Sequence, residues 1–169
     1  MDPLAHAAVA LMGRPLAPKA PVWALVAATQ VPDVLFFGFQ AVGLERQAAT
    51  QLDLSRGLIY LSQPLIPWSH GLLMCVVWSA VVGGLAHLFF RDWRASLVMG
   101  LLVFSHWLLD FTVYPNMPVL FGNSPVIGLG LITSQAGFIA GSLAEMALIA
   151  GGVFAAVRLW RAAPAAKRN

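Results

Sequence analysis

Long apolar runs separated by short polar connections make up most of this chain. A helix that crosses a lipid bilayer takes roughly 20 apolar residues, and three runs reach that length. They cover residues 69–90, 95–114 and 137–160. We expect each of them to form one membrane-spanning helix.

The stretch 21–44 is also long enough to span, but Pro32 and Asp33 interrupt it near its middle. Proline removes a backbone donor and kinks or ends a helix, so we expect two half-length helices, 21–31 and 34–44. A further short apolar run, 3–13, is joined to 21–31 by a proline-rich turn. These two pieces predict a hairpin of short helices.

The pattern therefore predicts an all-α fold, a polytopic transmembrane helical bundle of about four or five helices with an N-terminal half-helix hairpin. We expect residues 1–169 to form a single integral membrane domain, because the length allows no more than one. Composition agrees with lipid as the solvent. Charged residues make up 10% of the chain, against about 25% in soluble domains.

Charge distribution predicts the orientation and excludes one class of partner. The sequence pI is about 9.6, yet the basic residues are dispersed rather than gathered in a patch, so we expect no nucleic-acid partner. If 21–44 crosses once, eight basic residues fall on one side of the membrane, and only Arg46 and Arg56 fall on the other. The eight are Arg14, Lys19, Arg91, Arg94, Arg158, Arg161, Lys167 and Arg168. The positive-inside rule makes their side, with the C-terminus, cytoplasmic.

Several ionisable side chains fall inside the predicted spans, where an aspartate costs about 2.5–3.5 kcal/mol on insertion scales. They are Asp33, His70, His87, His106, Asp110 and Glu145, and His6 lies before them in the short run 3–13. The strongest local signal is His106-x-x-x-Asp110, because residues i and i+4 share one face of a helix. Zinc accepts this pairing of nitrogen and oxygen ligands; an internal His–Asp hydrogen bond would also satisfy the two groups.

Depth in the membrane favours a shared site. With the orientation above, His70, His106 and Asp110 lie in the outer halves of their segments, and Asp33 lies near the middle of its own. The position of His6 at the start of the hairpin places it at a level similar to that of Asp33. We therefore predict a divalent metal, with zinc as the expected ion, held by His6, Asp33, His70, His106 and Asp110.

Three residues carry open alternatives. Asp33 could simply cap a helix that starts at Val34. Glu145 could act as a ligand or a general base, or could hydrogen-bond a neighbouring helix. His87 lies near the cytoplasmic end of its predicted helix, and we expect it to be unconnected with the site.

The lone cysteine, Cys75, excludes an internal disulfide and a cysteine-based metal site.

These residues resemble the bacterial membrane-bound metal-dependent hydrolases, the family that includes the LexA-regulated inner-membrane hydrolase. The resemblance rests on an early histidine, His6, on Pro32-Asp33, on the sequence WSHG around His70, and on SHWLLD with His106 and Asp110. The ligand order is also similar to that of zinc-dependent phospholipase C. The resemblance implies a bacterial inner-membrane location and hydrolase activity.

The function expected from the site and the resemblance together is hydrolysis of a lipid or another amphipathic ester or phosphoester. Asp33 or Glu145 would serve as the catalytic base, and membrane lipids would be the partners. One alternative is a transporter of metal ions or protons, which a chain of this size would form only as a homo-oligomer. Another is a haem protein with two histidines as axial ligands.

Overall fold

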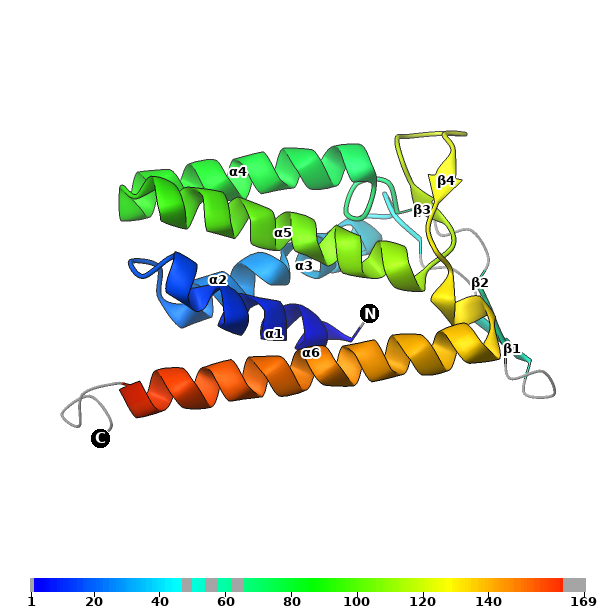
Figure 1. Cartoon of the computed structure of the whole chain (residues 1–169). Coiled ribbons are helices and arrows are strands. Elements are labelled where there is room, and N and C mark those ends of the chain that lie inside the picture. Colours follow the sequence, from blue (N-terminus) through cyan, green and yellow to red (C-terminus); the bar gives the residue numbers. More distant parts are fainter. Residues whose placement is uncertain (1, 47–49, 54–57, 62–65, 163–169) are drawn as a thin grey trace.

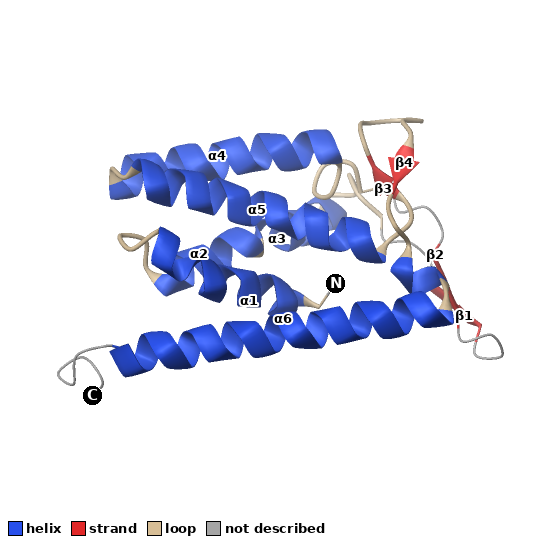
Figure 2. Cartoon of the chain, viewed as in Figure 1, coloured by secondary structure: helices blue, strands red, loops and turns tan. Residues whose placement is uncertain are grey.

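The structure is a computed structural model that describes residues 2–46, 50–53, 58–61 and 66–162. This part of the chain is mostly helical (Figures 1 and 2). Its α-helices are α1 (Pro3–Gly13), α2 (Val22–Thr29), α3 (Val31–Ala41), α4 (Leu72–Phe90), α5 (Trp93–Val113) and α6 (Gln135–Ala162). The short elements are the 3₁₀ turns η1 (Arg14–Leu16) and η2 (Leu131–Thr133) and the strands β1 (Thr50–Asp53), β2 (Leu58–Leu61), β3 (Met117–Pro118) and β4 (Val126–Ile127).

Three helices, α4, α5 and α6, are long and apolar enough to cross a membrane. The pair α2 and α3 qualifies as a fourth span if it counts as one, with a bend of 51° between its halves. The all-α bundle and its N-terminal half-helix hairpin are thereby confirmed.

The position of the helix break differs from the prediction. It falls at Gln30, and α3 already begins at Val31. Pro32 is tolerated there because a backbone N–H in the first turn of a helix has no intrahelical acceptor, so the N–H that proline lacks is not missed. Asp33 therefore lies inside the first turn of α3. The alternative in which Asp33 caps a helix starting at Val34 is wrong.

The helices form layers around α1. A sharp connection at Arg91 joins α4 to α5, and the two pack side by side as an antiparallel pair (Figure 1). Helix α1 packs against α6 on one side and against α2 and α5 on the other. With 11 residues and a rise of 1.5 Å per residue, α1 is about 16 Å long. It covers about half of a bilayer core of roughly 30 Å.

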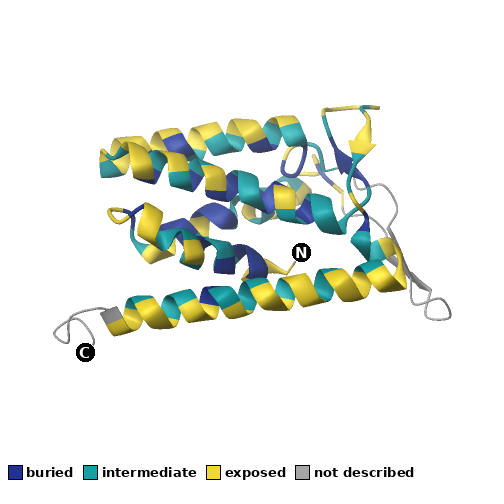
Figure 3. Cartoon of the chain, in the orientation of Figure 1, coloured by how far each residue is buried: buried dark blue, intermediate teal, exposed yellow. Residues whose placement is uncertain are grey.

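Small residues bring α1 close to its neighbours. The core between α1, α2 and α5 contains Ala10, Ala24 and Ala28. On the other side, a Cβ atom at Gly152 of α6 would lie 2.5 Å from the Cβ of Ala8. The outward faces of α4 and α6 are exposed and apolar, as Leu88, Phe89 and Phe154 show (Figure 3). Such surfaces suit contact with lipid tails.

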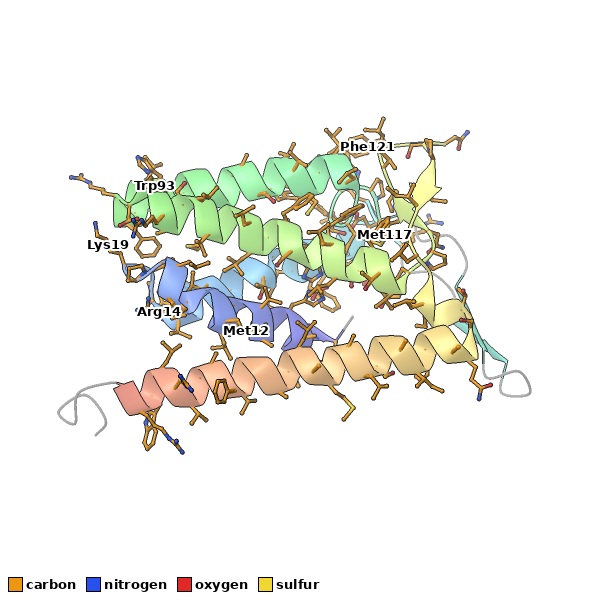
Figure 4. All side chains as sticks on the ribbon, viewed as in Figure 1. Met12, Arg14, Lys19, Trp93, Met117 and Phe121 are labelled. Atoms are coloured by element: carbon orange, nitrogen blue, oxygen red, sulfur yellow. The ribbon has the colours of Figure 1, made fainter. Side chains whose placement is uncertain are left out.

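The two ends of the bundle differ in chemistry (Figure 4). Arg14, Lys19 and Trp93 lie at one end, where the Lys19 ammonium pairs with Asp92 at 3.0 Å. Asp92 also caps α5 by accepting from the backbone N–H groups of Arg94 and Ala95. Met117 and Phe121 lie at the opposite end.

The connection between α5 and α6 contains the short pair of antiparallel strands β3 and β4 followed by η2. It is attached to the bundle through Leu73, whose N–H donates to the Val119 carbonyl, and through the ring contact of Trp68 with Phe121. Arg56, Lys167 and Arg168, which entered the charge count, lie outside the described residues.

The α4–α5 contact generates a prediction, because a Cβ atom at Gly100 would lie 2.9 Å from the Ser79 carbonyl oxygen. We expect Gly100→Leu to force the two helices apart and to destabilise the protein by about 1–3 kcal/mol, the usual cost of overpacking. Thermal unfolding in detergent measures it. The matched control is Gly84→Leu, because nothing lies within 4 Å of that position. Equal melting temperatures for the two variants would contradict the proposed contact.

Candidate metal centre

Five side chains from four parts of the chain converge inside the bundle. His6 comes from α1, Asp33 from the first turn of α3, and His106 and Asp110 from α5; His70 precedes α4. The structure thus brings together all five residues predicted as ligands. Two overlapping groups are close enough to share an ion: His6, His106 and Asp110, and Asp33, His70 and His106.

The two carboxylates lie at nearly equal distances from two imidazole nitrogens. Asp110 Oδ2 is 3.4 Å from His106 Nε2 and 3.6 Å from His70 Nε2. Asp33 Oδ1 is 3.5 Å from each of the same two nitrogens. The other oxygen of Asp110, Oδ1, lies 3.7 Å from His6 Nε2.

These separations match those between neighbouring ligands of a metal ion. They exceed the usual hydrogen-bond range of about 2.7–3.2 Å for nitrogen and oxygen. Around tetrahedral zinc, with bonds of about 2.0–2.2 Å, neighbouring ligand atoms are about 3.3–3.6 Å apart. The four distances that join Asp33 and Asp110 to His70 and His106 fall within or next to this interval. Two nitrogens and two oxygens are a donor set that zinc accepts.

Helix α2 ends where it can orient His106. Thr29 is the last residue of α2, and the last carbonyls of a helix have no intrahelical partner. The Thr29 carbonyl oxygen lies 2.7 Å from His106 Nδ1. A carbonyl can only accept, so Nδ1 carries a proton, and in the neutral ring Nε2 carries a lone pair. His106 Nε2 is buried and has no hydrogen-bond partner within the described residues, which is the condition of an imidazole ready to bind a cation.

His6 is held against His106 by ring stacking. The two rings are 3.7 Å apart between centroids and 8° from parallel. Two imidazolium ions would repel each other at this distance, so the stack disfavours two charged rings. With all three imidazoles neutral and both carboxylates ionised, the cluster would carry a charge of −2, which a divalent cation would neutralise. Neutralisation matters here because unpaired charge inside a membrane is expensive.

The five side chains of the cluster differ in how far they are exposed. The side chains of His6, His70, His106 and Asp110 are at most 8% exposed, whereas that of Asp33 is 31% exposed. Asp33 is therefore the one predicted ligand that a molecule outside the bundle can reach readily. Next to it on α3, Val34 and Phe37 are each 66% exposed, and the ring of Phe36 meets the edge of His70.

The structure places Glu145 and His87 apart from the five. Glu145 Oε1 accepts a hydrogen bond from the backbone N–H of Asp2 at 2.7 Å, and Asp2 in turn caps α1. Glu145 thus fastens the start of α1 to α6, and neither ion-sharing group within the described part of the chain includes it. This contact does not support the predicted role of Glu145 as a catalytic base. His87 is exposed in the last turn of α4, as expected for a residue unconnected with the site.

Sequence reasoning missed Glu45. The structure buries it to 1% exposure beside Ser69, the residue that precedes His70. Ser69 Oγ donates to Glu45 Oε2 at 2.6 Å and also lies 2.7 Å from His70 Nδ1. Glu45 and Ser69 are 24 positions apart, so no local spacing could have revealed the pair.

Comparisons with known proteins gave no match. No protein-family model matches the chain, and neither a curated protein nor a solved structure shows a significant match. The chain is a helical protein with three helices, or four if α2 and α3 count as one span, that are long and apolar enough to cross a membrane, and its histidine and aspartate cluster could hold a metal ion.

Proposed function

We propose that this protein is a membrane-embedded metal-dependent hydrolase that acts on a lipid or another amphipathic ester or phosphoester. The observation that carries the proposal is the set of four carboxylate–imidazole distances of 3.4–3.6 Å that join Asp33 and Asp110 to His70 and His106. The resemblance to bacterial membrane-bound metal-dependent hydrolases supports the same function. It also supports an inner-membrane location, and the positive-inside count supports a cytoplasmic C-terminus.

Zinc or a similar divalent ion, held by the five residues, would supply Lewis acidity toward the ester oxygen and would lower the pKa of water. The side chains of the cluster position the reacting groups and transfer the proton. His106 and His70 hold their Nε2 atoms toward the reaction centre, and Asp110 contributes negative charge. Asp33 takes the proton of the attacking water and passes it to the leaving alcohol as the ester bond breaks.

The surroundings of Asp33 support an amphipathic substrate. The polar part of such a molecule would approach Asp33, the most exposed of the five side chains. Its acyl chain would lie along Val34 and Phe37, which present apolar surface on the same helix. A fully water-soluble substrate would gain nothing from these side chains.

A transporter is the second candidate, and the 51° bend between α2 and α3 is the observation that favours it. Broken helices surround the ion sites of many transporters. The bend has another use here, however, because it presents both the Thr29 carbonyl and Asp33 to the cluster. We therefore place hydrolysis first.

Metal content tests the site itself. We expect detergent-purified protein to carry zinc or another divalent ion in a fixed ratio to the chain. The His106→Ala/Asp110→Ala double variant should lose this ion, because it removes a nitrogen and an oxygen ligand at the centre of the cluster. Elemental analysis measures the ratio. His87→Ala, an exposed histidine outside the cluster, serves as the control and should keep full metal content. A double variant that keeps its metal would contradict the site.

Turnover tests the reaction. We expect the metal-loaded protein to hydrolyse at least one class of ester or phosphoester lipid in mixed micelles. Asp33→Asn should lower kcat by about 10²–10⁴-fold, the range for loss of a general base, when compared at equal metal content. His87→Ala should retain full activity. Metal or proton flux in proteoliposomes, with no turnover across a panel of lipids, would instead support the transporter.

A further inference from the structure

Glu45 is a buried carboxylate with a full set of donors. It follows α3 and is 1% exposed. Its Oε1 accepts from the backbone N–H groups of Trp68 and Ser69, both at 2.8 Å, and its Oε2 accepts from the Ser69 hydroxyl at 2.6 Å. A buried carboxylate is costly unless such donors compensate for lost water. The three bonds tie Glu45 to the two residues that lead into His70.

The hydroxyl of Ser69 has only one proton to give. Because that proton goes to Glu45, Ser69 Oγ must act as the acceptor in its 2.7 Å contact with His70 Nδ1. Nδ1 of His70 therefore carries a proton. In the neutral ring the lone pair is then on Nε2, the atom that lies 3.5 Å from Asp33 and 3.6 Å from Asp110.

We propose that Glu45 is a positioning residue of the metal centre, which acts through the Ser69 hydroxyl to fix the His70 proton on Nδ1 and leave Nε2 free to bind a divalent cation. The consequence for metal affinity rests on the proposed function, whereas the proton position does not. Histidines that bind metals usually donate their second ring N–H to a carboxylate, a carbonyl or water. His106 follows that rule directly through Thr29, and His70 follows it through a serine.

Glu45 could also be a structural residue that only holds the backbone of Trp68 and Ser69. Glu45→Gln separates the two roles. The amide oxygen of the variant would still accept from both backbone N–H groups, so that anchor remains. The amide NH₂ would replace Oε2 and could only donate to Ser69 Oγ. The serine proton would then turn to His70 Nδ1 and drive the ring proton to Nε2, which blocks the metal-binding atom.

Ser69→Ala is the matched comparison. It removes the relay but leaves both backbone contacts of Glu45 in place, and it allows His70 to adopt either tautomer. We therefore expect the isosteric Glu45→Gln to lower zinc affinity by about 10–100-fold, the usual effect of a lost outer partner, and Ser69→Ala to lower it less. His87→Ala, which changes an exposed histidine outside the cluster, should leave the affinity unchanged.

The experiment combines two readouts on detergent-purified full-length chain. Nitrogen-15 NMR of labelled histidine in the metal-free protein, with His70 assigned by His70→Ala, reports which ring nitrogen is protonated. Competition with a zinc-binding chromophore reports affinity. We expect Nδ1–H in the wild type and Nε2–H in Glu45→Gln. A wild type protonated on Nε2, or a ring proton that stays on Nδ1 in Glu45→Gln, would overturn the proposal.

The two proposals fail in different ways. A wild-type protein with the expected proton on Nδ1 but no zinc binding would refute the metal centre, while supporting the control of His70 by Glu45. Full zinc affinity in Glu45→Gln, equal to that of the wild type, would refute the positioning role and would leave the metal centre standing.

Discussion

Negative charge buried among apolar helices is the constraint on which the rest of the structure depends. Asp110 is buried and Asp33 is partly buried, both beside His70 and His106, and in lipid such carboxylates persist only with compensating partners. The neighbouring imidazoles compensate this negative charge, and nearby polar groups orient those imidazoles. His70 and His106 approach both carboxylates, His6 stacks on His106, and the Thr29 carbonyl and Ser69 hydroxyl hold the outer ring nitrogens. The bundle is organised around this cluster as much as around its apolar contacts.

The break between α2 and α3 is the main structural device that builds the cluster. One interruption at Gln30 presents the Thr29 carbonyl to His106 and places Asp33 in the first turn of the next helix. A continuous helix would use that carbonyl internally. Proline suits the position because it needs no intrahelical hydrogen bond in the first turn. The conformational cost of the break is thus offset by two polar contacts at the centre.

Features with a local physical cause were predictable from the sequence. Lipid requires long apolar runs, so α4, α5 and α6 were found close to their observed bounds, and the i,i+4 spacing placed His106 and Asp110 on one face. The helix break was misplaced by about two residues because proline is compatible with a first turn. Glu45 and the true contact of Glu145 depend on partners 24 and 143 positions away. Only tertiary packing brings such residues together, and the sequence contains no spacing that records it.

The short length of α1 has a consequence for the order of assembly. At about 16 Å, α1 cannot span a bilayer alone, and its outer side is covered by α6, the last helix of the described chain. The partners of the His6 ring, His106 and Asp110, are both on α5. The centre can therefore form only after α5 exists and α1 packs against it, while α6 covers the other side of α1. Assembly of the centre is thus a non-local event.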